Sequence, residues 1–158
     1  MRIAVCIKQV PDTETKIKLN SDNSGIDPTG IKWVVNPYDE HAIEESIKLR
    51  DANPGSTITA FTIGLKPRAS EVLRTALAMG VDEAVAVDSP NYLDASLTAK
   101  ALAGAIKKEG AFDLVLTGKL AIDDNAASVS QMLANELSVP HATVISKLTL
   151  SGASVVVE

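Results

Sequence analysis

The stretch Thr117–Asn125, TGKLAIDDN, combines a glycine, a lysine and two adjacent acids directly after the apolar run FDLVLT. A glycine lets the backbone pass close to a ligand, and the first amides of a helix starting near Asp124 or Asn125 would attract an anion such as phosphate. Alternatively, Asp124 or Asn125 is a helix N-cap and Gly118 ends a strand in a tight turn. Taken alone, these residues leave both interpretations open.

Other residues that could support catalysis or metal binding occur singly. Cys6 lies in an apolar run, where a thiol behaves as a small apolar side chain. His41 and His141 each lack a second ligand at a metal-binding spacing, so surface or packing roles are expected. The acids between residues 39 and 45 fit a solvated helix face, and the sequence lacks a G-x-S-x-G nucleophile elbow. We therefore predict no catalytic residues and no metal ligands.

The composition restricts the function classes further. Fifteen basic and twenty acidic side chains give a net charge of −5, which argues against nucleic-acid binding. The single cysteine cannot form an internal disulfide, and the first apolar run is too short for a signal peptide. No apolar stretch approaches the roughly 20 residues that a membrane-spanning helix needs. We expect a cytoplasmic protein without membrane insertion.

The hydrophobic pattern predicts strands alternating with helices. The first strand covers 2–8, and an irregular excursion with short alternating pieces at 17–19 and 31–35 follows it. The remaining elements are a helix at 38–52, a strand at 56–64, a helix at 66–80, a strand at 81–88, a helix at 92–110, a strand at 112–118 and a helix at 126–137. Residues 139–158 complete the prediction with a fifth strand and the start of a hairpin that turns at Ser151-Gly152.

This alternation specifies βαβ units, so the predicted fold class is a three-layer, Rossmann-like α/β domain with a mostly parallel sheet, spanning residues 1–158. Such sheets bind ligands at the carboxyl ends of their strands, where the strand order reverses. Three predicted loops lie at such ends, namely Cys6–Val10, Ile63–Lys66 and Thr117–Asn125. The G-x-G-x-x-G and G-x-x-x-x-G-K-[ST] patterns are both lacking in the sequence, so a nucleotide site would be of another type.

Four stretches jointly resemble the β subunit of the electron transfer flavoproteins. They are VCIKQVPD at 5–12, NPYDEHAIEESIKL at 36–49, RTALAMGVDEAV at 74–85 and DLVLTGKLAIDDN at 113–125. The resemblance implies a domain of the adenine-nucleotide alpha-hydrolase-like type that binds AMP structurally and pairs with a larger α subunit, which chiefly holds the redox FAD. It further implies an electron carrier, not an enzyme, taking electrons from acyl-CoA dehydrogenase-type donors toward a membrane quinone reductase.

The resemblance also implies the nucleotide contacts. They are Cys6, Asn36, Pro37, Tyr38, Asp39, Ile63, Gly118, Lys119, Leu120, Ala121, Ile122, Asp123, Asp124, Asn125, Ala126, Ala127, Ser128 and Val129. Cys6 becomes a wall of the adenine pocket, and Lys8 lies nearby with no partner assigned. A capped helix start after TGKLAIDDN would then also hold the phosphate.

The chain departs from the family pattern in two respects. Ala127–Gln131 replaces a polar N-Q-T-G-Q, so Ser128 and backbone amides must supply the phosphate contacts. Family β subunits also continue through a recognition loop with an exposed leucine and an arm that wraps the α subunit, so we expect this chain to be truncated relative to the family.

Two other functions remain open. In electron-bifurcating relatives a second FAD occupies the AMP pocket, although the I-D-D-N sequence here is closer to the ordinary type than to D-G-D-T. A stand-alone adenine-nucleotide-binding protein of the universal-stress type is the other alternative, but such proteins tend to carry a longer glycine-rich phosphate loop.

Overall fold

A parallel four-stranded sheet forms the centre of the computed structural model, which describes residues 1–152 and 154–158. Its strands are β1 (Arg2–Cys6), β4 (Thr57–Gly64), β5 (Glu83–Asp88) and β6 (Leu114–Thr117), in the spatial order β5-β4-β1-β6. β1 lies in the middle, with Ile3 opposite Ile58 of β4 on one side and Leu114 of β6 on the other. The predicted α/β class is thus confirmed.

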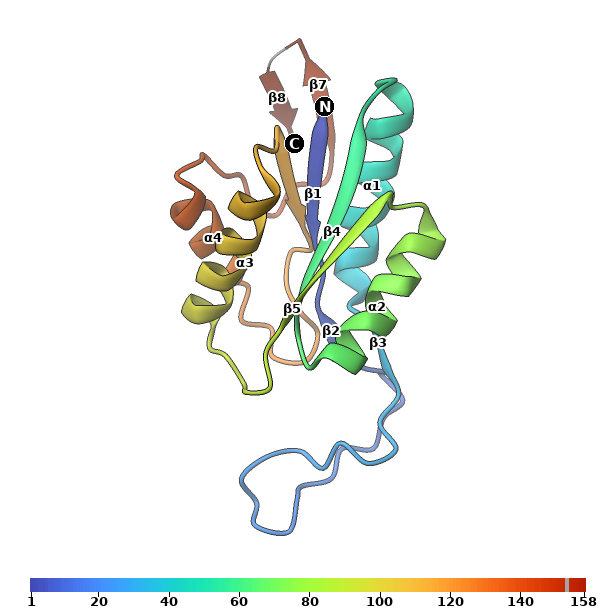
Figure 1. Ribbon diagram of the computed structural model, residues 1–158, viewed down its shortest axis with the longest axis vertical. Helices are drawn as coiled ribbons and strands as arrows, with labels where there is room; N and C mark the ends of the chain where they lie inside the picture. The colour runs from blue at the N-terminus through green and yellow to red at the C-terminus, as the bar shows by residue number, and fades with distance from the viewer. Residues whose placement is uncertain (153) are drawn as a thin grey trace.

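Two helices cover each face of the sheet, which makes three layers (Figure 1). On one face lie α1 (Pro37–Ala52) and α2 (Lys66–Met79), and on the other lie α3 (Ala95–Glu109) and α4 (Val129–Leu137). Each face has its own apolar core. Ile3, Val5, Ile43, Ile58 and Val72 belong to the first core. Ala4, Phe61, Leu102, Ile106 and Leu133 belong to the second.

Local signals in the sequence explain where the helices begin and end. Pro37 stands at the start of α1, whose first turn is acidic and whose last turn holds Arg50, as the helix dipole favours. Asp94 caps α3 by accepting a hydrogen bond from the Leu97 N–H at 2.8 Å. Gly80 ends α2 with a φ of 120°, which a residue with a Cβ rarely adopts.

The order of the strands creates a topological switch point beside β1. The chain runs from β1 to β4 and β5 on one side and then crosses to β6 on the other side. The loops that follow β1 and β6 therefore separate above and below the sheet, which leaves a crevice at the carboxyl edge. This is where the sequence places its candidate loops.

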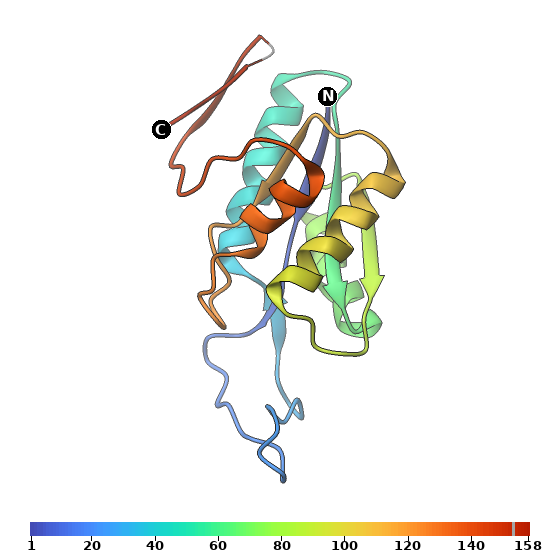
Figure 2. The same ribbon diagram turned by 90° about the vertical axis from the view of Figure 1, so that its left-hand side faces the viewer.

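Residues 9–35 form the predicted excursion, and the piece at 31–35 contains a short strand. After β1, residues Gln9–Pro11 form β2, which pairs antiparallel with β3 (Trp33–Val35). The segment between them makes an isolated bridge between Leu19 and Ile26 and projects from the carboxyl edge of the sheet (Figures 1 and 2). The first strand ends at Cys6 instead of residue 8, because the chain leaves the main sheet to form β2.

The structure shifts the start of the last helix and keeps the final strands outside the main sheet. The helix predicted from residue 126 begins at Val129, since Asn125 and Ala127 have left-handed φ values of 53° and 47°. The predicted final hairpin is present, since β7 (Leu148–Ser151) pairs antiparallel with β8 (Ser154–Val157), and neither strand joins the main sheet. The hairpin lies at the margin of the domain (Figure 2), where Leu148 and Leu150 pack against the first core. Across the described part of the chain, no helix has the length and apolarity needed to cross a membrane.

Candidate functional site

A cavity of about 540 Å³ opens at the carboxyl edge of the sheet. It is lined by the segments that follow all four parallel strands, namely Cys6–Gln9 after β1, Ile63–Leu65 at the end of β4, Ser89–Leu93 after β5 and Thr117–Ala121 after β6. Asp123, Asp124 and Ala126–Ser130 complete the wall on the side of α4. The structure therefore brings the three predicted loops to one cavity.

Most of the predicted contact residues line this cavity. They are Cys6, Asn36, Asp39, Ile63, Gly118, Lys119, Leu120, Ala121, Asp123, Asp124, Ala126, Ala127, Ser128 and Val129. Among the described residues, Pro37, Tyr38, Ile122 and Asn125 were also predicted but lie outside the lining. Lys66, from the second predicted loop, is also outside it, and its N–H donates to Asp88 at 3.0 Å.

Asp39 connects the loop after β1 to the loop after β6. Its carboxylate accepts hydrogen bonds from the backbone N–H of Lys8 at 2.7 Å and of Gly118 at 3.0 Å. Burial raises the pKa of Asp39 to about 6, although hydrogen bonds from Lys8, Asn36 and Gly118 and the charge of Lys8 oppose this rise. The side chain is only 6% exposed, so its two oxygens are committed to the protein backbone.

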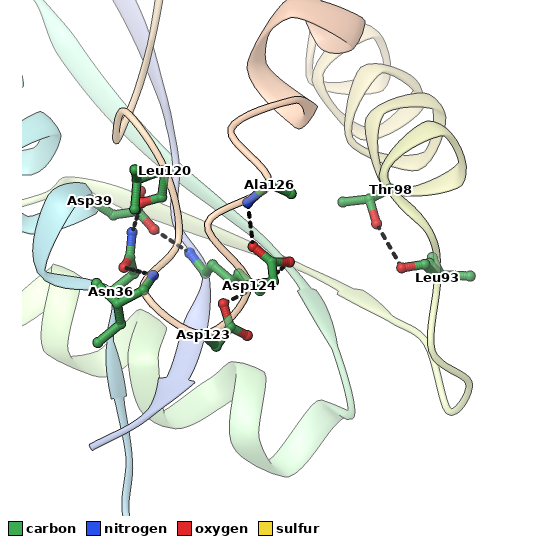
Figure 3. Close-up of polar contacts among 10 residues, drawn as sticks. Asn36, Asp39, Leu93, Thr98, Leu120, Asp123, Asp124 and Ala126 are labelled. Atoms are coloured by element: carbon green, nitrogen blue, oxygen red, sulfur yellow. Dashed lines mark hydrogen bonds and ion pairs between the residues drawn. The ribbon is translucent and has the colours of Figure 1, made fainter. Parts of the chain in front are cut away.

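Asn36 joins the same two loops one turn earlier. Its N–H donates to the Lys8 carbonyl at 2.9 Å, its Nδ2 donates to the Leu120 carbonyl at 2.8 Å and its Oδ1 accepts from the Ile122 N–H at 3.2 Å. Figure 3 shows Asn36 and Asp39 directed at the loop that carries Leu120. The NPYD corner at the start of α1 therefore fixes the shape of the crevice.

Gly118 has a role that differs from the predicted one. A Cβ at this position would overlap Asp39 Oδ1 and would lie 2.7 Å from the Tyr38 carbonyl carbon and 2.8 Å from the Asp39 nitrogen. The glycine is thus required by the close approach of the α1 N-terminus, on the side of the loop that faces the helix. Because its φ is not positive, conformational freedom is not the reason for a glycine here.

Lys8 has partners that the sequence did not reveal. Its Nζ lies 2.8 Å from Asp123 Oδ1 and 3.1 Å from Asp124 Oδ2, so one ammonium bridges the two adjacent acids. Burial lowers the pKa of Lys8, but its hydrogen bonds and charge interactions with Asp123 and Asp124 outweigh burial and raise that pKa above its ordinary value. The two acids thus face a cation across the crevice.

The acidic turn is not a helix N-cap. Asp124 Oδ1 accepts from the Ala126 N–H at 3.0 Å, which closes a short turn that ends three residues before the start of α4 (Figure 3). The residue that precedes α4 is Ser128, whose side chain makes no capping hydrogen bond. The first N–H groups of this nine-residue helix have no partners within the helix, and Val129 and Ser130 line the cavity.

Cys6 forms part of the cavity wall close to Asp39. It is 8% exposed, and burial, together with the nearby charge of Asp39, raises the pKa of its thiol from 9.0 to about 12. A protonated, small side chain is consistent with the predicted role as wall of an apolar pocket.

One side of the cavity consists of residues that the sequence did not predict. Trp33 and Arg68 both line it, and the Arg68 guanidinium stacks over the Trp33 ring at 4.2 Å. Residues Ser89–Leu93 follow β5, and the rule that selected the other strand ends would have selected this loop too. No local pattern in the sequence predicts the Trp33–Arg68 pair, because the two residues lie 35 positions apart, in β3 and α2.

The histidines take no part in the cavity. His41 and His141 are exposed, and within residues 1–152 and 154–158 no cluster of three or more potential metal-binding side chains occurs.

Fold and site together define a doubly wound α/β protein with a cavity at its topological switch point. The chain belongs to the electron transfer flavoprotein domain family, whose model matches residues 25–158.

Curated relatives agree with this assignment. The chain is 38% identical over 155 residues to the electron transfer flavoprotein subunit beta of Dictyostelium discoideum, which covers 98% of this chain and 61% of the relative. It is also 38% identical over 162 residues to the electron transfer flavoprotein subunit beta of Bos taurus, and this match covers 100% of this chain and 63% of the relative. It is also 37% identical over 159 residues to the caffeyl-CoA reductase-Etf complex subunit CarD of Acetobacterium woodii, covering 99% and 60%. The chain thus spans about three fifths of the length of these relatives.

Proposed function

We propose that residues 1–158 form one nucleotide-binding domain that holds AMP in the cavity at the switch point. The observation that carries this proposal is the convergence of all four strand ends on a cavity of about 540 Å³. Small-molecule sites typically occupy roughly 300–1,000 Å³, and open α/β sheets bind ligands at this position.

The donor and acceptor groups of the cavity suit a nucleoside monophosphate. The uncapped N-terminus of α4 offers backbone N–H groups to a phosphate, and Ser128 and Ser130 line the cavity beside it. Gln9 also lines the cavity, and its Oε1 is buried without a hydrogen-bond partner among the described residues. Such an oxygen can accept a hydrogen bond from the amino group of adenine. Cys6 and Ile63 supply the apolar walls that a base ring prefers.

At the level of the assembly, we propose that the chain contributes the β-type half of a heterodimer with an FAD-bearing α subunit. That complex would carry electrons from acyl-CoA dehydrogenase-type donors to a membrane quinone reductase. The domain itself supplies AMP binding and a surface for the α subunit, with no catalytic side chain of its own. Support comes from the family and from the names of the β subunits that this chain resembles.

Nucleotide release tests the cavity. Purified chain, denatured by heat, should release AMP that mass spectrometry identifies, and chain freed of nucleotide should bind AMP stoichiometrically in calorimetry. A preparation without nucleotide, and without stabilisation by added AMP or FAD, would overturn the proposal. Two flavins per heterodimer after co-expression with an α subunit would instead favour the second-FAD alternative, which similarity to subunit CarD keeps open.

A further inference from the structure

We propose that Lys8 is the residue that lets an anion bind beside the acidic turn, because it neutralises Asp123 and Asp124 and holds both carboxylates on the β1 side of the crevice. This inference rests on the AMP binding proposed above. It makes Lys8 a positioning residue, since it acts through the two acids and not through contact with the nucleotide.

The geometry of the three side chains carries the inference. Lys8 comes from the loop after β1 and the acids come from the loop after β6, so the ion pairs cross the switch point. All three residues line the cavity, and Figure 3 shows Asp123 and Asp124 side by side on the same loop. Nζ bonds one oxygen of each acid, at 2.8 Å and 3.1 Å, and thereby fixes both carboxylates at one point.

The charge of this cluster determines what it does to an anion. With Lys8 the three side chains sum to one negative charge, and without it they sum to two. The start of α4 follows the acidic turn within five residues, so a phosphate at the helix N-terminus lies within reach of the carboxylates' field. The other oxygen of Asp124 accepts a hydrogen bond from the Ala126 N–H, which directs that carboxylate further into the turn.

A different role for Lys8 predicts a different outcome. If Lys8 released the acids and bonded the phosphate directly, removing an acid could not replace the lost ammonium. If Lys8 acts by neutralisation, removing one acid restores the charge of the cluster and with it the affinity for the anion. A double variant therefore separates the two roles.

The experiment compares AMP with adenosine, which lacks the phosphate, on the full chain by calorimetry. The ratio of the two affinities reports the phosphate alone, because contacts to base and ribose cancel. Lys8→Met should lower this ratio about tenfold, and K8M/D123N should return it to within about threefold of the unchanged chain. Lys32→Met is the matched control, since it removes a lysine–aspartate pair of 2.8 Å outside this cavity and should leave the ratio unchanged.

Three results would overturn the inference. The first is a ratio that K8M does not change, whether both affinities stay the same or fall equally. The second is a ratio that stays low in K8M/D123N. The third is a ratio that falls in Lys32→Met as much as in K8M. If K8M does not fold, Asp123→Asn alone is the test. This variant should raise the ratio, because the cluster of Lys8 and the two acids becomes neutral. An unchanged ratio would contradict the inference. A wild-type chain that binds no AMP would overturn the proposed function together with this inference, whereas AMP binding that is insensitive to K8M would overturn the inference only.

Discussion

Asp39 Oδ1 accepts a hydrogen bond of 3.0 Å from the backbone N–H of Gly118, a residue 79 positions later in the sequence. The other oxygen of the same carboxylate accepts from Lys8 at 2.7 Å. A single buried side chain at the start of α1 therefore sets the distance between the loops that follow β1 and β6. The width of the crevice at the switch point depends on this contact.

Replacing Gly118 by alanine should destabilise the fold. The added Cβ would lie 2.7 Å from the Tyr38 carbonyl carbon, which belongs to a backbone that cannot move aside without shifting α1. We expect a loss of about 1–3 kcal/mol in the free energy of unfolding, measured by urea denaturation. Gly104→Ala is the matched control: a Cβ there meets nothing within 4 Å, and the helix interior of α3 should gain up to about 1 kcal/mol.

Asp39→Asn should change how stability depends on pH. The native carboxyl has a pKa of about 6 against an ordinary 3.8, so the folded state binds the proton more tightly than the unfolded state between these values. Its contribution to stability is therefore present at low pH and is lost as the pH rises through about 6. The stability of the unchanged chain minus that of D39N should fall by up to about 3 kcal/mol from pH 4 to pH 7. A difference that stays constant, or that rises with pH, would contradict the burial of this carboxyl.

Ala127→Gly should stabilise the chain. Ala127 has a φ of 47°, in the left-handed region where a Cβ is unfavourable. Glycine relieves that cost but loses more entropy on folding, so we expect a net gain of about 0.5–1 kcal/mol in urea denaturation. Ala126→Gly is the control, because Ala126 is not among the positive-φ residues and should lose stability instead.

Cys6 should react very slowly with thiol reagents in the folded chain. Its pKa is raised from 9.0 to about 12, which lowers the thiolate fraction near neutral pH by about a thousandfold, and its side chain is 8% exposed. A chromogenic disulfide reagent at pH 8 should therefore modify it at the rate of unfolding, and denaturant should remove the protection. Folded chain that reacts as fast as a free thiol would show that the cavity wall opens readily.

The order and type of most elements could be predicted from the sequence, because buried β-branched runs and terminal helix signals act locally. The run RIAVCIK predicts a central strand, and Pro37 and Gly80 mark helix ends that the structure confirms. The errors lie where a distant partner decides the outcome. The first strand was predicted to reach residue 8 but ends at Cys6, because Gln9–Pro11 pairs with Trp33–Val35. The two strands of the last hairpin pair with each other and not with the main sheet.

The position of the cavity could be predicted from the sequence, but the contacts inside it could not. The rule for carboxyl strand ends locates the loops, whereas the roles of Asp39, Lys8 and Gly118 depend on pairs separated by 31 to 115 residues. Gly118 is an example. The sequence indicates that the backbone at this position lies close to another group, and the structure identifies that group as the start of α1. The late start of α4 likewise follows from the left-handed backbone conformation of Ala127, which an alanine in the sequence does not predict.

Trp33 is the only tryptophan in the chain, and it stands at the cavity with Arg68 over its ring at 4.2 Å. Indole emission from this protein therefore originates at a single point on the edge of the proposed binding site. This tryptophan is therefore an intrinsic fluorescent probe of the proposed site. A base that displaces the guanidinium would change the wavelength or the intensity of its emission without any added label.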